Sequence, residues 1–246
     1  MLKVSSIILI VVASICVLFS VNYASPSGYQ RQQKNEAPVV KIITPKNNSS
    51  FDDKSLVNYS ITVSDRDDGE SKFDEINVKE ILLEVKSIND ESKLAVELNK
   101  ADQEDPRGLE VIRTSNCFNC HGFDTKVIGP SFNDIGKRYK PTSANMALLQ
   151  KRISEGSKGV WGKVPMPTHP ELTTQQTSEM VKWIMQITSD PTVHYYIGSE
   201  GPLHLNNPNN SKTAACILTA SYTDHGLKED STHRLKGQDI IMIRTH

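Results

Sequence analysis

Five consecutive residues near the middle of the chain, Cys117-Phe118-Asn119-Cys120-His121, place two thiols and an imidazole at a fixed short spacing. In a Cys-x-x-Cys-His run the two thiols add across the two vinyl groups of haem, and the adjacent histidine reaches the iron. A zinc site would need two more ligands at matching spacing, and the other cysteines, Cys16 and Cys216, each stand alone. The pentad therefore predicts one covalently attached haem c.

A second axial ligand is expected further along the chain, where a segment can fold over the other haem face. Met166 is the predicted ligand, because the prolines of Val164-Pro165-Met166-Pro167 stiffen a segment without regular structure. His169 is the alternative. With His121 and Met166 as the two metal ligands, no coordination position is open for oxygen or peroxide. We therefore expect electron transfer at the iron, with no catalytic residues.

Apolar residues recur at helical spacing between Asp105 and Ile187, which indicates an all-α unit around the pentad. Asp105 and Pro106 predict an N-cap and a proline at the first helical position of a helix that ends with the pentad. Thr173 and Gln176 have the spacing of a capping box. The elements that must position the haem ligands are therefore helices.

Alternation with period two predicts strands on both sides of the helical unit. The apolar positions are Val40, Ile42, Val57 to Val63, Ile81 to Val85, Val193 to Ile197, Cys216 to Tyr222 and Ile240 to Ile243. Each block is thin for a stable sandwich alone, but together they have about the right size. We expect one sandwich with the helical unit inserted between its strands; the alternative is two separate small β modules.

The N-terminal segment has an early lysine and then a polar-poor run, which is the layout of a secretory signal. The run of about 18 residues also reaches the lower limit for spanning a bilayer, so an uncleaved anchor is the alternative. The predicted division is a signal peptide or membrane anchor over 1–24, a flexible linker over 25–36, a β segment over 37–100, the helical domain over 101–190 and a second β segment over 191–246. The expected location is the periplasm or the cell surface.

Opposite charges nearly balance, with 28 Lys and Arg against 29 Asp and Glu, which argues against nucleic-acid binding. The basic side chains of the helical unit are interpreted as a solvated surface, with a docking face for a partner protein as the alternative. They are Lys137, Arg138, Lys140, Lys151 and Arg152.

Two further features of the β segments have alternative interpretations. Asp65, Asp67 and Asp68 are read as solvated turn acids, with a calcium site as the alternative. Tyr195 and Tyr196 are read as core or rim residues, with sugar stacking as the alternative. Cys216 is interpreted as a buried core thiol.

The helical unit resembles the small bacterial class I cytochromes c that donate electrons to nitrite reductases and oxidases. The resemblance rests on the pentad, Ile128-Gly129-Pro130, the run from Gly156 to Gly162, Val164 to Pro167, and a final helix with Trp183. It implies that His121 is the proximal ligand and Met166 the distal one. It also implies that the Pro130 carbonyl accepts the proximal imidazole N–H, and that Trp161 lies beside a haem propionate.

The β segments resemble the opening and closing strands of bacterial Ig-like or polycystic-kidney-disease-type domains. The matching residues are Ala37 to Asp65 in the first segment, and Cys216 to Gly226 and Gln238 to Arg244 in the second. The expected fold class is α+β multidomain, an all-α class I cytochrome c domain plus an all-β Ig-like sandwich.

The expected function is that of an exported monohaem c-type cytochrome, which carries single electrons between a donor protein and an acceptor protein. Its β module would serve docking or attachment. One alternative is a cell-surface glycan- or protein-binding module, in which the haem accepts electrons from a quinoprotein-type dehydrogenase. Another is a haem redox sensor, which predicts ligand exchange at the iron.

Overall fold

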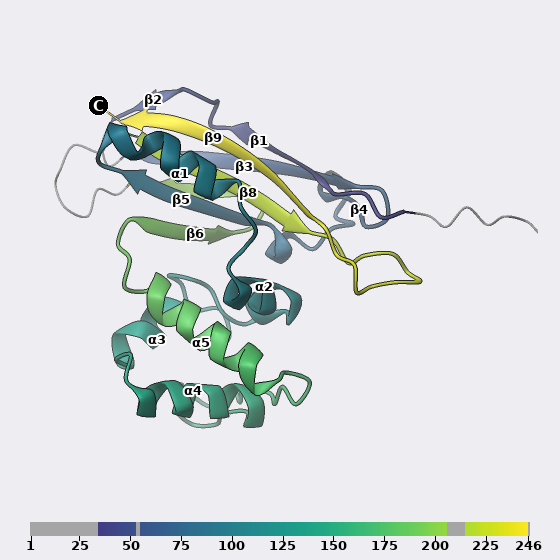
Figure 1. The fold of residues 1–246 in the computed structure, drawn as a ribbon, viewed down its shortest axis with the longest axis vertical. Coiled ribbons are helices and arrows are strands. Elements are labelled where there is room, and N and C mark those ends of the chain that lie inside the picture. The colour runs from purple at the N-terminus through teal and green to yellow at the C-terminus, as the bar shows by residue number, and fades with distance from the viewer. Residues whose placement is uncertain (1–33, 53–54, 206–214, 246) are drawn as a thin grey trace, which may run out of the picture. The chain divides into compact units, whose positions relative to one another are not determined.

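The computed structural model describes residues 34–52, 55–205 and 215–245. The predicted signal peptide or anchor and most of the predicted linker lie outside these ranges. Within them, no helix combines the length and the apolar character that crossing a bilayer requires. The described residues hold two β-sheets and a group of helices that follows β5 and precedes β6 (Figure 1).

The first sheet is built around β3 (Leu56–Asp65), which pairs antiparallel with every other strand of that sheet. Its partners are β1 (Val39–Thr44), β4 (Gly69–Glu70) and β7 (Glu200–His204). The second sheet has the order β2 (Ser50–Phe51), β9 (Lys236–Thr245), β8 (Ala215–Thr223), β5 (Leu82–Ile88) and β6 (Val193–Ile197). Each sheet therefore combines strands that precede the helices with strands that follow them.

A shared apolar core lies between the two sheets. Alternate residues of β3 point into it, namely Val57, Tyr59, Ile61 and Val63. They meet residues of the second sheet, among them Leu83, Val85, Leu218 and Ile243, each at most 1% exposed. Cys216 is fully buried there, which confirms its interpretation as a core thiol. The period-two prediction is thus confirmed for β3, which buries one face, whereas β5 and β8 are buried on both faces.

One helix lies inside the segment that was predicted to be β. Residues Leu94–Ala101 form α1 after a 3₁₀ turn, η3 (Glu91–Lys93), whose N-cap Asp90 accepts a hydrogen bond from the Ser92 backbone. The predicted strands of this segment end at Val85, and the helix was not predicted. Its physical reason is local: Leu, Ala, Glu and Lys dominate the segment and favour a helix. Two further 3₁₀ turns, η1 (Ser71–Phe73) and η2 (Val78–Glu80), precede β5.

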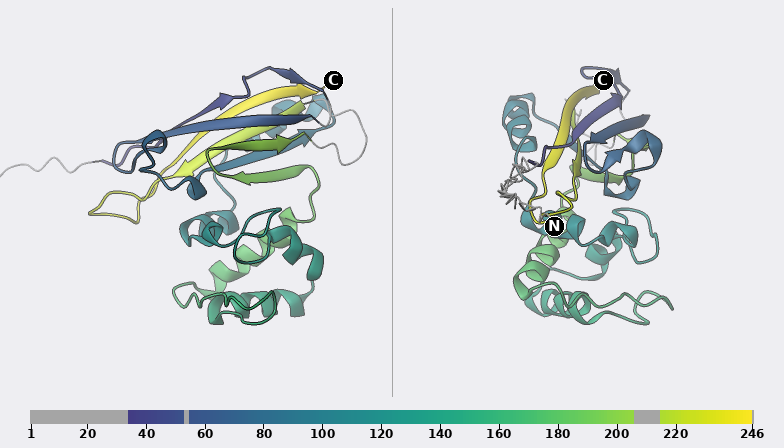
Figure 2. Two further views of the ribbon diagram at one scale, coloured as in Figure 1. Left: turned by 180° about the vertical axis from the view of Figure 1, so that it is seen from behind. Right: turned by 90° about the vertical axis from the view of Figure 1, so that its right-hand side faces the viewer.

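The helices that follow form a group of their own (Figures 1 and 2). They are α2 (Arg107–Thr114), the 3₁₀ turn η4 (Cys117–Asn119), α3 (Phe132–Arg138), α4 (Ser143–Glu155) and α5 (Thr174–Ile187). Their inward faces form a second core, which includes Leu109, Ile112, Phe132, Ile153, Val181 and Trp183. The helix α2 passes so close to α5 that a Cβ on Gly108 would lie 2.6 Å from the Trp183 Cβ.

The two predicted helix starts have different outcomes. The capping box of α5 is confirmed: the Thr173 hydroxyl accepts from the Gln176 backbone N–H, and the Gln176 side chain accepts from the Thr173 backbone. The predicted N-cap at Asp105 is wrong, because α2 begins at Arg107 with Pro106 at the cap position and no side-chain cap bond. The Asp105 carboxylate instead binds two cations, Arg113 and Lys236.

The second sheet also contributes to the helical core. Leu82 of β5 and Tyr195 of β6 belong to the same buried cluster as the residues of α2 and α5. Polar contacts join the two parts as well, since the Arg113 guanidinium of α2 donates to the Ser221 hydroxyl of β8 at 2.9 Å. The sheet is therefore one of the elements that position the helices around the pentad.

Candidate haem site

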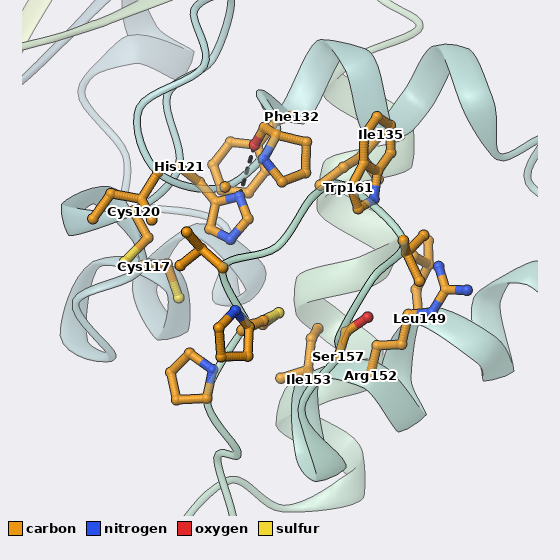
Figure 3. A pocket seen from close by; sticks show the side chains of 18 of the residues that line it. Cys117, Cys120, His121, Phe132, Ile135, Leu149, Arg152, Ile153, Ser157 and Trp161 are labelled. Carbon is orange, nitrogen blue, oxygen red and sulfur yellow. Dashed lines mark hydrogen bonds between the residues drawn. The ribbon is translucent and has the colours of Figure 1, made fainter.

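A pocket opens among α2 to α5, and all six residues predicted to bind the cofactor line it (Figure 3). They are Cys117, Cys120, His121, Pro130, Trp161 and Met166. The rest of the wall is mostly apolar and includes Ile112, Phe132, Ile135, Leu149, Ile153, Val181 and Ile184. The fold thus brings together, around one apolar space, side chains that are up to 72 positions apart in the sequence, from Ile112 to Ile184.

The pentad forms a tight turn of its own rather than the end of α2. Asn116 adopts the left-handed conformation with φ 57°, and η4 follows immediately. The backbone N–H of His121 donates to the Cys117 carbonyl at 2.9 Å, which closes the turn. Neither cysteine forms a disulfide, and both line the pocket beside the imidazole. Burial raises the pKa of the Cys117 thiol to about 12, and the nearby Cys120 adds to this effect.

His121 is held in one tautomer by the carbonyl of Pro130. The Nδ1 atom lies 2.7 Å from that oxygen, and because a carbonyl only accepts, Nδ1 carries the proton. Burial lowers the pKa of His121, although the bond to Pro130 opposes the shift, so the ring is neutral. The Nε2 atom therefore keeps a lone pair, which is the state that an iron ligand requires.

Close packing restricts the orientation of the same ring. Phe132 stacks on His121 with 5.6 Å between the ring centroids and 13° between the planes. On another side, a Cβ at Gly129 would lie 2.5 Å from His121 Cε1, so only glycine fits there. Pro130 thus determines the tautomer, and Gly129 together with Phe132 restricts the orientation of the ring.

Met166 is held by backbone bonds as well as by the neighbouring prolines. It forms an isolated antiparallel bridge with Ser157, with N–H to O distances of 2.8 and 3.2 Å in the two directions. Gly156 adopts φ 79°, and a Cβ there would lie 2.8 Å from the Met166 carbonyl. The alternative ligand, His169, makes a 2.8 Å contact from Nδ1 to the Glu171 carboxylate and is not among the residues that line the pocket.

Two arginines accompany Trp161 at the rim of the pocket. The Arg138 guanidinium lies 4.6 Å from the indole centroid and donates to the Val160 carbonyl. Arg152 lines the pocket and donates to the Tyr139 hydroxyl. The solvated-surface interpretation is therefore wrong for Arg152, which is half-buried; Lys137, Lys140 and Lys151 are exposed, as both a solvated surface and a docking face require. Sequence reasoning missed Arg152 because helical spacing alone does not show which basic side chain faces a pocket.

The side chains of this pocket fit a haem c. Two thiols, a neutral imidazole with a free Nε2 and a thioether face one apolar space, and a guanidinium with an indole lies at its rim. These groups match the two vinyl bonds, the two axial positions and the anionic propionates of the cofactor.

The alternative sites in the β segments gain no support. Tyr195 is 6% exposed and buried in the helical core, so the sugar-stacking alternative is wrong for this residue. Asp65 is 7% exposed, and its carboxylate accepts hydrogen bonds from the backbones of Asp67 and Asp68. The Asp68 carboxylate accepts from the Tyr222 hydroxyl. Among the described residues, no group of three or more His, Cys, Asp or Glu could hold a metal ion.

Comparison with known proteins locates the likeness in the helical part of the chain. The family model described as Cytochrome c matches residues 106–188. Cytochrome c-551 of Pseudomonas aeruginosa is 34% identical over 82 residues, which are 33% of this chain and 76% of that protein. Cytochrome c-552 of Nitrosomonas europaea is 32% identical over 78 residues, covering 32% of this chain and 76% of that protein.

Solved structures give a match over the same share of the chain. The crystal structure of wild-type Nitrosomonas europaea cytochrome c552 is 32% identical and covers 32% of this chain and 96% of that one, with a TM-score of 0.31. The family assignment rests on the match to Pseudomonas aeruginosa cytochrome c-551, which at 34% identity is covered over 76% of its length by the segment that carries the pentad and its pocket. On these grounds the chain belongs to the cytochrome c family, as a class I member with one covalently bound haem c.

Proposed function

We propose that this protein is a monohaem electron carrier, in which Cys117 and Cys120 attach the haem and His121 and Met166 bind its iron. The observation that carries the proposal is the hydrogen bond from His121 Nδ1 to the Pro130 carbonyl. It leaves Nε2 with its lone pair in the same pocket as the two thiols and Met166. When bound, the haem supplies reversible exchange of a single electron between ferric and ferrous iron.

The protein's contribution is to keep both axial ligands in place through that exchange. Pro130 fixes the tautomer of His121, and the bridge to Ser157 holds the chain at Met166. Since both axial positions are then occupied by the protein, no site is left for a substrate. Such a closed arrangement suits electron transfer between proteins, in which no bond forms or breaks. It does not suit a redox sensor, which would have to exchange a ligand at the iron.

Two kinds of wall residue tune the site. The aliphatic side chains of Ile112, Ile153 and Val181 are at most 8% exposed and exclude water, which favours the less charged ferrous state. At the rim, the Arg152 guanidinium and the Trp161 indole N–H are donors suited to propionate oxygens. We assign both to propionate binding.

An apolar edge beside the pocket suits contact with redox partners. Ile128 and Val164 both line the pocket, yet they are 51% and 66% exposed. Apolar side chains at such an opening let a donor or an acceptor protein approach the haem edge closely and exclude water from the contact. We propose this edge as the site of electron entry and exit.

The domain organisation that we propose is a cytochrome domain over 101–190, inserted in one β domain made of 37–100 and 191–246. It is supported by the pairing of β3 with β7, and of β5 with both β6 and β8, which joins strands from the two segments in each sheet. An Ig-like sandwich that serves docking or attachment, and export to the periplasm or cell surface, complete the proposal.

Redox titration with absorption spectra tests the assignment of the ligands. We expect the ferric wild type to show the weak far-red band of methionine-ligated haem. That band should be lost in Met166→Ala and retained in His169→Ala, and the potential of Met166→Ala should fall. Persistence of the band in Met166→Ala, or its absence from the wild type, would refute Met166 as the ligand.

Covalent attachment is tested separately by extraction with acidified organic solvent. The double variant Cys117→Ser, Cys120→Ser should release its haem, whereas Cys216→Ser, whose thiol is buried between the sheets, should retain it. Haem that stays bound to the double variant would show that other residues attach it.

A further inference from the structure

A series of aromatic rings links the second sheet to His121. Tyr195 of β6 stacks on Phe123, with 4.6 Å between the centroids and 22° between the planes. Phe123 meets Phe132 edge to face at 5.4 Å, and Phe132 stacks on the His121 imidazole at 5.6 Å. Trp183 of α5 packs edge to face against Tyr195, Phe123 and Phe132. Three successive contacts therefore connect a strand to the imidazole.

The outer end of this series is firmly anchored. Tyr195 lies on β6, opposite Glu84 in the antiparallel pairing with β5. Its hydroxyl donates to the Glu84 carboxylate at 2.7 Å, and the ring is 6% exposed. Burial, followed by the nearby Glu84 charge, raises the pKa of the phenol, so it stays protonated and remains a donor. The ring is thus fixed by the backbone pairing at one end and by the hydrogen bond at the other.

We propose that Tyr195 is a positioning residue for the proximal haem ligand, by which the β part of the chain sets the orientation of the His121 ring. The proposal rests on the proposed function, because it takes His121 as the iron ligand. Interiors are close-packed, so a ring that is fixed in the sheet limits the positions open to Phe123, then to Phe132 and the imidazole. The two β-sheets then influence the properties of the haem, in addition to the docking or attachment role proposed above.

The expected consequence concerns the electronic structure and the potential of the haem. The orientation of an axial imidazole determines how unpaired spin is distributed over the ferric haem. If Tyr195 is shortened, Phe123 and Phe132 gain freedom and water can approach the proximal side. We expect an altered spin distribution and a lower potential, since a more polar surrounding favours ferric iron.

The test uses the full-length holoprotein and three variants of β6. Tyr195→Leu removes the ring, and Tyr195→Phe removes only the hydroxyl. Tyr196→Leu is the matched control, because its neighbouring ring faces the core between the sheets, where it packs 5.9 Å from Tyr59. Each is measured by spectroelectrochemical titration and by the haem methyl resonances in proton NMR of the ferric form.

We expect Tyr195→Leu to change the spread of the methyl resonances and to lower the potential, while Tyr195→Phe stays close to the wild type. Tyr196→Leu should lower the melting temperature without moving either readout. If Tyr195→Leu matures with the resonances and the potential of the wild type, the proposal is overturned. If Tyr195→Leu does not mature, Phe123→Leu removes the middle ring instead. Changed methyl resonances and a lower potential in Phe123→Leu would support the proposal, and wild-type values would overturn it.

Failure of this proposal is distinguishable from failure of the proposed function. If His121 and Met166 were not the ligands, the wild-type spectrum would already lack the far-red band of methionine ligation. An intact band in the wild type, together with unchanged variants, would reject only the role of Tyr195.

Discussion

The imidazole of His121 and the carbonyl of Pro130 are joined by a 2.7 Å hydrogen bond that closes the loop between the pentad and α3. Backbone bonds support the same loop, since the Cys120 carbonyl accepts from Gly129 and the Gly122 carbonyl accepts from Phe132. The tautomer of the ligand thus depends on a short loop whose two ends are tied together. Substitutions in this loop should act on the haem rather than on the fold as a whole.

Gly129→Ala should disturb the haem site directly. The new Cβ would lie 2.5 Å from His121 Cε1 and 3.0 Å from Nδ1, so the imidazole or the loop must shift. We expect a weaker far-red band and a changed potential in the ferric protein, recorded by absorption and redox titration. Val127→Ala, at a side chain 46% exposed in the same loop, is the control. Wild-type spectra and potential in Gly129→Ala would contradict the proposed packing.

Gly108→Ala should weaken the contact between α2 and α5. Its Cβ would lie 2.3 Å from the Glu179 carbonyl oxygen, which is backbone and cannot move aside alone. Overpacking of this kind typically costs about 1–3 kcal/mol. The free energy of unfolding of the holoprotein, measured with guanidinium, should fall by that amount, while Glu110→Ala on the exposed face of α2 should change it little. Equal stability of the two variants would rule out the close crossing.

The buried charges between α2 and the second sheet should respond unequally to substitution. Asp105 accepts from Arg113 at 2.9 Å and Lys236 at 3.0 Å, and the Arg113 side chain is 5% exposed. Asp105→Ala leaves a buried guanidinium without its carboxylate, which typically costs about 3–5 kcal/mol. Arg113→Met should cost less, because Asp105 keeps Lys236. Chemical unfolding measures the free energy of unfolding of both variants. A larger decrease in Arg113→Met than in Asp105→Ala would contradict this interpretation.

Glu84→Gln should change how stability depends on pH. Burial is the largest cause that raises the pKa of Glu84 above its ordinary value of 4.5, and the Tyr195 hydrogen bond opposes it. Below pH 4.5 the acid is neutral in both the folded and the unfolded states. As pH rises through 4.5, Glu84 ionises first in the unfolded chain, and the protein therefore loses stability. The loss continues until the pH has passed the pKa of Glu84 in the folded state, and then levels off.

The variant lacks this ionisation and still offers an oxygen to the Tyr195 hydroxyl. Its free energy of unfolding, relative to the wild type, should therefore rise between pH 4 and pH 7. Urea unfolding of both proteins at several pH values measures the difference. A constant difference across that range would show that Glu84 ionises equally in both states.

The features that the sequence determined by itself are local in the chain. The spacing of Cys117, Cys120 and His121 is dictated by covalent attachment to one cofactor, so it is legible without a fold. The capping box at Thr173 involves residues of one helical turn, and the alternation in β3 reflects one face of one strand. Such patterns can be read from the sequence because they involve only residues that are close together along the chain.

Only the tertiary structure decided what lies against each face. Both Leu82 and Leu83 are buried, because β5 has the helical core on one side and the core between the sheets on the other. For the same reason Tyr195 belongs to the helical core and Tyr196 packs against the core between the sheets, which alternation alone does not reveal. Asp105 was predicted to be an N-cap, yet its carboxylate binds Arg113 on the next turns of α2 and Lys236 of β9, which is 131 residues away. Contacts between residues far apart in the chain depend on how whole elements pack, and no local pattern records that packing.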